Sequence, residues 1–256
     1  MRDLLATTGS AALEAQGVSS APLLAHWLYF HSYSPMTEVA PDGHAKGGVF
    51  LPPVNLPRRM WAGSRVDFLR PLRIGASIAR RSTITDVQEK AGRSGKLIFV
   101  RVEHRVSDES GPVLSESQDI VYRDLPATNG MAGPPKLAPT KVDWARRIEP
   151  NPVLLFRYSA LTFNSHRIHY DRTYVTEVEG YPGLIVHGPL IATLLLHELT
   201  ARRPNADITH YSFRAVRPLF DTTPFFVCGS DEGSIVRLFA RDEEGALCME
   251  ALATLR

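Results

Sequence analysis

The same succession of sequence signals occurs twice in this chain, once on each side of a segment rich in proline and glycine. That segment, residues 125–139, reads LPATNGMAGPPKLAP, a composition that does not sustain a helix or a central strand and so predicts a linker. The tripeptide Arg-Pro-Leu occurs at residues 70–72 and again at 217–219. In each half a strand-like run follows, and then an acidic turn that ends in glycine, DESG at 108–111 and DEEG at 242–245.

This ordered repetition predicts a duplicated α+β unit. Residues 96–106 alternate between apolar and charged side chains, which is the period of a half-buried strand. Residues 235–240 have the matching position in the second half. A repeat of about 120 residues is too long for a solenoid. We therefore predict an N-terminal module over residues 1–124, a linker over 125–140 and a C-terminal module over 141–256.

One helix of the C-terminal module is expected to be buried on nearly every side, because residues 190–196 read LIATLLL. It begins with Gly188 and Pro189, and a proline in the first turn loses no helical hydrogen bond. It ends with Arg202 and Arg203, which suit the negative end of the helix dipole. A sheet curled around one buried helix is the hotdog architecture, and two such units give an α+β double hotdog.

The N-terminal module offers no comparable helix. Residues 48–53 have the place of residues 184–189, but they lead into PRRMW at 57–61, which cannot begin a long regular helix. We therefore predict that the central helix of this module is degenerate. The module is then expected to bind substrate, while the C-terminal module keeps the chemistry.

Composition excludes several classes of protein. The net charge of +2 and the scattered basic residues give no case for nucleic acid, and no apolar run reaches the roughly 18 residues of a membrane span. The two cysteines, Cys228 and Cys248, form no CxxC pair and fit a reduced thiol pair better than a secreted disulfide framework. With no signal-peptide pattern, we expect a soluble, cytoplasmic protein without membrane partners.

The densest polar cluster, TFNSHRIHYD at residues 162–171, is followed by GLIVHGP at 183–189. With HWLYF at 26–30, FLPP at 50–53 and LPRRMWAG at 56–63, the chain resembles the MaoC-like, R-specific enoyl-CoA hydratase superfamily. It is most similar to the double-hotdog branch with itaconyl-CoA and mesaconyl-C4-CoA hydratases. The resemblance covers nearly the whole chain. It implies a hydro-lyase that hydrates an α,β-unsaturated acyl-CoA, with itaconyl-CoA or mesaconyl-C4-CoA giving citramalyl-CoA.

The family motif has an acidic residue five positions before a histidine. The resemblance therefore implies that His169 is the general base, since an imidazole titrates at about 6.5, close to working pH. Asn164 stands in the acidic place, and its amide can orient a water through the carbonyl oxygen but cannot take the proton. A different alignment puts Thr162 in that place, and this alternative stays open.

Hydration also builds negative charge on the thioester oxygen, as an enolate. A backbone N–H at a helix N-terminus, backed by the helix dipole, suits that charge. Gly188 is the expected donor, because a glycine lets the thioester approach the backbone closely.

The other candidates are residues expected to bind substrate: Arg58, Arg59, His166, Arg167, Tyr170 and His187. The arginine pair suits a second carboxylate, with a solvated surface pair as the alternative. His187, beside a buried helix, fits a structural role better than a catalytic one. No metal is expected: His166, His169 and Asp171 resemble part of a metal site, but no further ligand motif accompanies them.

The expected partner is an acyl-CoA, and no cofactor is expected beyond the coenzyme A of the substrate. Two other functions remain open. One is a 3-hydroxyacyl-ACP dehydratase of fatty-acid synthesis, which differs in the carrier. The other is a non-catalytic acyl-thioester binder, because Asn164 replaces the acid. Association of two chains into a homodimer also stays open.

Overall fold

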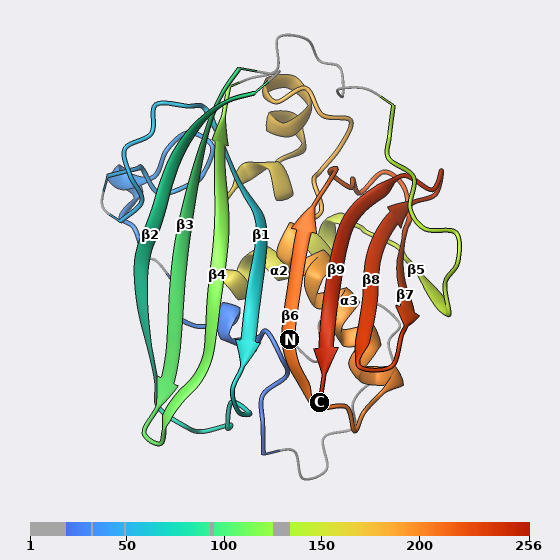
Figure 1. Cartoon of the computed structure of the whole chain (residues 1–256). Helices are drawn as coiled ribbons and strands as arrows, with labels where there is room; N and C mark the ends of the chain where they lie inside the picture. The colour runs from blue at the N-terminus through green and yellow to red at the C-terminus, as the bar shows by residue number, and fades with distance from the viewer. Residues whose placement is uncertain (1–18, 32, 49, 93–94, 125–133) are drawn as a thin grey trace.

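Nine strands form one antiparallel sheet in this computed structural model, which describes residues 19–31, 33–48, 50–92, 95–124 and 134–256 (Figure 1). The strands are β1 (Arg58–Phe68), β2 (Ile78–Gly92), β3 (Gly95–Asp108), β4 (Gly111–Arg123), β5 (Trp144–Ile148), β6 (Ile208–Ala215), β7 (Phe225–Asp231), β8 (Ile235–Asp242) and β9 (Leu247–Leu255). The helices are α2 (Pro152–Thr162) and α3 (Gly188–Arg202), with 3₁₀ turns at Ala25–Leu28, Met36–Glu38 and Arg167–His169 and a π-helical turn at Tyr174–Val178.

The two halves of the sheet repeat one strand order around their junction. The order is β2-β3-β4-β1-β6-β9-β8-β7-β5, so β4, β3 and β2 follow β1 outward as β9, β8 and β7 follow β6. The junction is the antiparallel pair β1–β6, from Gly63↔Arg214 to Asp67↔His210. The chain therefore forms one continuous sheet, in which the sheets of the two halves are joined edge to edge. The predicted module boundaries stay a prediction, because residues 125–133 of the linker lie outside the described residues.

The two acidic turns join β3 to β4 and β8 to β9. Each ends in glycine because the backbone there has a positive φ, 111° at Gly111 and 87° at Gly245, which side chains disfavour. In each turn the first aspartate accepts a backbone N–H: Asp108 from Ser110 at 2.7 Å, and Asp242 from Ala246 at 2.8 Å. The repeated sequence signal thus marks a turn between two strands in each half, with a shorter connection at 109–110 than at 243–246.

Helix α3 is the buried helix that the sequence predicts. All ten residues from 190 to 199 are buried, and the helix packs against β7, β8 and β9 (Figure 1). Pro189 lies in its first turn and Arg202 in its last. Its apolar side chains are part of the main core of the molecule. This packing fixes the position of the N-terminus of α3.

Helix α2 was not predicted, although its start carries a local signal. The side chain of Asn151 accepts a hydrogen bond from Leu154 N at 2.9 Å, and Pro152 follows directly, which is a typical helix start. The helix buries Leu154, Leu155, Tyr158 and Ser159 on one face. It ends at Phe163, whose φ is 52°.

Among the described residues, the N-terminal half has no α-helix, and the degenerate central helix stays a prediction. The 3₁₀ turn Ala25–Leu28 packs near α2, and its side chains surround a buried carboxylate. Glu116 accepts hydrogen bonds from Ser64 Oγ at 2.6 Å and Trp27 Nε1 at 3.1 Å, and lies 3.0 Å from His26 Nε2. This half therefore contains a buried polar cluster as well as an apolar one at Val100, Val102 and Tyr122.

Arg58 and Arg59 begin β1, where they pair with Arg123 and Tyr122 of β4. The stretch at 57–61, expected to replace a helix, is thus mostly strand. Strand pairing fixes both backbones, and alternation sends the two side chains to opposite faces. Within the described residues, no helix is long and apolar enough to cross a membrane.

Candidate active site

His169 lies in the 3₁₀ turn Arg167–His169, and its ring is buried. Its Nδ1 is 2.7 Å from the carbonyl oxygen of Ile185. A carbonyl can only accept, so Nδ1 carries the proton and Nε2 has the free lone pair. Burial lowers the pKa of His169 to about 4, and the bond to Ile185 opposes this only in part. The ring is therefore neutral near pH 7, and Nε2 is the nitrogen that can accept a proton.

His187 is stacked on His169, with ring centroids 3.7 Å apart and an interplanar angle of 18°. Its Nε2 lies 2.9 Å from Ser159 Oγ in α2, and the Tyr158 ring packs at its edge. Burial lowers the pKa of His187 well below 6.5. Its Nδ1 is buried and has no hydrogen-bond partner among the described residues. The neutral ring of His187 thus contacts both α2 and His169, directly before the first residue of α3.

Gly188 is the first residue of α3, so its N–H has no acceptor within the helix. A Cβ placed on Gly188 would come no closer than 3.9 Å to Met249 Cε and 4.0 Å to Trp61 O. Packing alone therefore does not require a glycine. The open side of this position is compatible with a thioester oxygen beside the N–H.

Asn164 and Thr162, the two candidates for the acidic place, both make local bonds. Asn164 Oδ1 accepts a hydrogen bond from His166 N at 3.0 Å, and a carbonyl oxygen has a second lone pair that can hold a water. Thr162 Oγ1 donates to Tyr158 O of its own helix at 2.7 Å. The structure thus places no carboxylate at either position.

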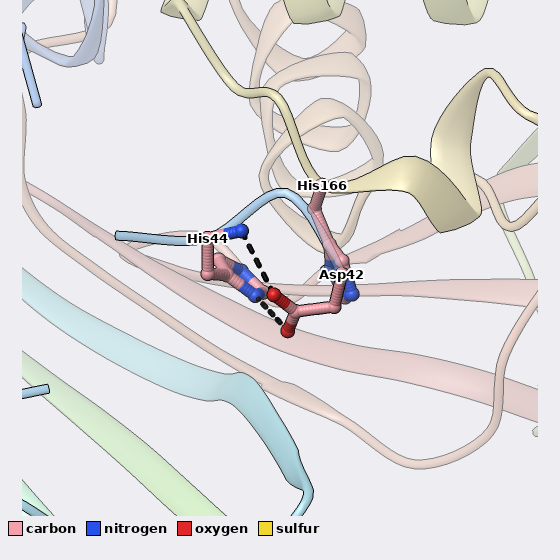
Figure 2. Close-up of side chains that lie close together, drawn as sticks. All are labelled: Asp42, His44 and His166. Atoms are coloured by element: carbon pink, nitrogen blue, oxygen red, sulfur yellow. Dashed lines mark hydrogen bonds and ion pairs between the residues drawn. The ribbon is translucent and has the colours of Figure 1, made fainter. Parts of the chain in front are cut away.

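A carboxylate comes instead from the loop of residues 40–46, far away in the sequence. Asp42 Oδ2 lies 2.9 Å from His44 Nδ1, and Asp42 Oδ1 accepts from His44 N at 2.9 Å. The His44 ring packs on His166 with centroids 3.9 Å apart, as Figure 2 shows. His166 in turn lies edge-on to His169 at 5.5 Å. Four histidines, 44, 166, 169 and 187, therefore form one continuous group of rings.

Several contacts hold this loop against the motif of residues 162–171. Arg167 N donates to Asp42 O at 2.8 Å, and Ser165 Oγ donates to Gly43 O at 2.5 Å. Arg167 Nη1 also donates to Pro41 O at 3.1 Å. Gly43 has a φ of 92°, and a Cβ there would stand 1.8 Å from Ser165 O. The fit of loop to motif therefore requires a glycine.

Arg167 and Tyr170, expected to bind substrate, make contacts within the protein. The Arg167 guanidinium forms an ion pair with Asp171 at 2.8 Å, and Tyr170 donates to Ser165 O at 3.0 Å. Asp171 also accepts from Tyr174 N at 3.0 Å. The Asp171 carboxylate, part of the alternative metal site with His166 and His169, is thus bound to Arg167.

Arg58 and Arg59 differ in their surroundings. Arg58 forms an ion pair with Glu179 at 2.9 Å and donates to Tyr181 Oη at 3.1 Å, and both carboxylate and guanidinium are largely buried. Arg59 forms no ion pair within the described part of the chain. Its positive charge instead acts on His44, whose pKa it helps to lower. Of the pair, Arg59 is thus the cation beside the histidine group.

The charge states of the loop follow from burial and hydrogen bonding. Burial raises the pKa of Asp42, but hydrogen bonds from His44 outweigh this and lower it. Burial lowers the pKa of His166 to about 2, helped by its histidine neighbours and Arg59. The ligand atoms of Asp42, His44 and His166 lie within 4.8 Å of one another. The guanidinium of Arg59 acts electrostatically on His44 and His166 and disfavours a further cation there.

Sequence reasoning missed Asp42, His44, Tyr158 and Ser159. The first two carry a weak signal, an Asp-Gly-His tripeptide at 42–44, whose Asp-Gly start is read simply as a turn. The last two lie one helical turn from the motif in α2. Recognising α2 from Asn151 and Pro152 would have placed them beside His187.

Comparison with known proteins identifies relatives over most of the chain. Residues 24–221 match the family model described as hydroxyacyl-thioester dehydratase type 2. The chain is 44% identical over 237 residues to the mesaconyl-C(4)-CoA hydratase of Chloroflexus aurantiacus, covering 93% of this chain and 84% of that protein. It is 27% identical over 240 residues to the mitochondrial hydroxyacyl-thioester dehydratase type 2 of Schizosaccharomyces pombe, covering 82% and 78%.

Solved structures with the same fold include a MaoC-like dehydratase from Phytophthora capsici. It superposes with a TM-score of 0.67 at 18% identity, covering 100% of this chain and 92% of that one. HtdX from Mycobacterium tuberculosis superposes with a TM-score of 0.61 at 18% identity, covering 77% and 76%. These likenesses concern the fold, and the predicted hotdog fold is confirmed.

Proposed function

Because the chain belongs to the hydroxyacyl-thioester dehydratase type 2 family, we propose that it is a hydro-lyase acting on α,β-unsaturated acyl-CoA thioesters. The observation that carries the proposal is the position of His169. Its ring is neutral, its proton is on Nδ1, and it stacks on the residue that precedes Gly188. A base and an enolate-stabilising N–H are thereby held by one structural unit.

In this proposal His169 Nε2 takes the proton of a water that attacks the acyl β-carbon. The second lone pair of Asn164 Oδ1 helps to orient that water. The thioester oxygen lies against Gly188 N–H, where the N-terminus of α3 stabilises the enolate. Positioned proton transfer contributes roughly 10²–10⁴-fold to such a reaction, and loss of an oxyanion donor typically costs about 10²–10³ in rate.

For the acyl group we propose a dicarboxylate-derived one: mesaconyl-C4-CoA, which gives citramalyl-CoA directly, or itaconyl-CoA, whose double bond must first move into conjugation with the thioester. The 44% identical relative is named for the first of these substrates. In mesaconyl-C4-CoA the free carboxylate is attached to the β-carbon that receives the hydroxyl group. A cation that binds it must therefore lie close to the base. Arg59, which acts on the His44 and His166 charges and has no carboxylate partner among the described residues, fits that requirement.

The test is turnover by purified protein of mesaconyl-C4-CoA, itaconyl-CoA and crotonyl-CoA, followed as new mass or loss of enone absorbance. His169→Ala should lower kcat by at least about 10²-fold while the fold stays intact. Asn164→Asp should retain or raise activity, because it restores an acid at the family position. Near-wild-type turnover in His169→Ala would favour a binding protein without catalysis.

A second carrier remains to be compared, since the fungal relative is named only for a hydroxyacyl thioester. Offering crotonyl groups on coenzyme A and on acyl-carrier protein to the same enzyme decides this. We expect a higher kcat/KM for the coenzyme A form. A preference for the carrier protein would move the function to fatty-acid synthesis.

A further inference from the structure

The hydratase motif does not account for the loop of residues 40–46, which the N-terminal half brings onto the histidine group (Figure 2). Backbone bonds of Asp42 and Gly43 fasten this loop to the motif, and Gly43 fits against Ser165 without room for a side chain. The loop thereby holds Asp42 and His44 beside His166. A loop that is fastened this tightly gives Asp42 and His44 a fixed position in the site.

The reaction needs a group that holds a proton for part of its course, because the water loses one before the acyl α-carbon gains one. His169 is poorly suited to hold it. Its Nδ1 partner is the Ile185 carbonyl rather than a carboxylate. Asn164 cannot accept a proton, and the Asp171 carboxylate is bound to Arg167. The motif alone therefore lacks a group in which the positive charge is balanced.

His44 has the partner that His169 lacks. Asp42 holds the Nδ1 side of its ring at 2.9 Å, so Nε2 is the nitrogen that exchanges protons. A carboxylate in this position orients an imidazole and stabilises the imidazolium that forms on protonation. Of histidines 44, 166, 169 and 187, His44 is the one whose ring is hydrogen-bonded to a carboxylate within the described part of the chain.

Resting on the proposed hydratase function, we propose that His44, backed by Asp42, is a second acid–base residue of the reaction. The water O–H bond breaks, its oxygen bonds to the acyl β-carbon, and its proton goes to His169 Nε2. The electron pair of the carbon–carbon double bond becomes the enolate. The proton then passes through water, the co-substrate of the reaction, to His44 Nε2.

The second half of the reaction consumes the enolate. The N–H bond on His44 breaks, its electron pair stays on Nε2, and the enolate pair forms the new bond between hydrogen and the acyl α-carbon. Both histidines end neutral, as they began. The ring of His166 lies between them, with its centroid 3.9 Å from that of His44 and 5.5 Å from that of His169, and burial keeps it neutral.

Turnover and isotope effects of His44→Ala and Asp42→Asn test this role. We expect kcat to fall by at least about 10²-fold for His44→Ala and at least about 10-fold for Asp42→Asn. Dehydration of 3-hydroxybutyryl-CoA deuterated at the acyl α-carbon should show a larger isotope effect in Asp42→Asn than in wild type. Added imidazole should restore part of the turnover of His44→Ala, because it replaces the lost base.

A matched control comes from His210 and Asp67, another His–Asp pair at 2.7 Å, exposed at the β1–β6 junction. His210→Ala should keep wild-type turnover and isotope effect. Near-wild-type turnover in His44→Ala overturns the acid–base role. So does a loss that imidazole does not restore, with a wild-type isotope effect in Asp42→Asn. Wild-type protein that hydrates no enoyl-CoA overturns the proposed function, and the role of His44 with it.

Discussion

At the scale of single residues, the effect of Gly188 on packing can be distinguished from its proposed role in catalysis. A Cβ at this position meets only ordinary contacts, 3.9 Å and 4.0 Å away. Alanine is also the better helix former by about 1 kcal/mol. Packing therefore does not require a glycine here, which is compatible with the proposed approach of a thioester to its N–H.

Gly188→Ala should accordingly leave the melting temperature unchanged or raise it, while kcat falls by about 10-fold or more as the thioester oxygen is kept from the N–H. Thermal unfolding and steady-state kinetics on one preparation measure both. Unchanged kcat would show that the enolate is stabilised elsewhere.

The neighbouring arginines offer a second prediction at this scale. Arg59→Met should lower kcat/KM for mesaconyl-C4-CoA about 10- to 100-fold, the effect of losing a hydrogen bond to a charged group. Crotonyl-CoA has no second carboxylate, so its kcat/KM should change little.

Arg58→Met is the control, since Arg58 is neutralised by Glu179. It should lower thermal stability and leave the ratio of the two kcat/KM values unchanged. Equal effects of Arg59→Met on both substrates would mean that neither arginine recognises a carboxylate.

At the scale of elements, the loop of residues 40–46 and the motif act as one unit. Gly43→Ala should displace the loop, because its Cβ would stand 1.8 Å from Ser165 O and φ is 92°. We expect a fall in kcat through lost placement of Asp42 and His44, with a left-handed strain of about 1–2 kcal/mol.

Gly75→Ala separates these two effects. Gly75 has a similar φ of 86° but nothing within 4 Å of a Cβ. This variant should show the strain in thermal unfolding and keep wild-type kcat. If both variants keep wild-type kcat, the loop does not contribute to the chemistry.

At the scale of the whole molecule, Glu116 and Glu250 lie five residues after the glycines of the two equivalent turns, yet only the first is buried. Glu116→Ala leaves the His26, Trp27 and Ser64 partners in the core unsatisfied, and should cost about 3–5 kcal/mol of unfolding free energy. Glu250 pairs with Arg214 and Lys136 at the surface, so Glu250→Ala should cost less than about 1 kcal/mol. Denaturant unfolding of both variants measures the difference.

The Glu116 cluster also predicts a pH dependence of stability. Burial raises the pKa of Glu116, but hydrogen bonds from His26 and Ser64 outweigh this and lower it below 4.5. A carboxyl group whose pKa is lowered by folding stabilises the protein above its unfolded pKa, and this is lost as pH falls below it. Wild type should therefore lose stability below about pH 4.5 more steeply than Glu116→Gln.

The sequence by itself determined those features that depend on local sequence patterns. The repeated series predicted a turn between two strands in each half, because acidic residues and a glycine that accepts a positive φ both favour turns. The run at 190–196 predicted α3, since a helix apolar on every side has to be buried. The spacing of Asn164, His169 and Gly188 matched a family motif, and the structure places His169 and Gly188 at one helix N-terminus.

Only the tertiary structure decided which chemical groups meet there. Asp42 and His44 reach the motif across more than a hundred residues, and no spacing or period encodes a contact between loops at that separation. Arg58 and Arg59 are identical in sequence character, and the Glu179 carboxylate, which lies beside one of them, makes them different. Charge partners and desolvation depend on the packed molecule, and these set the state of every histidine in the site.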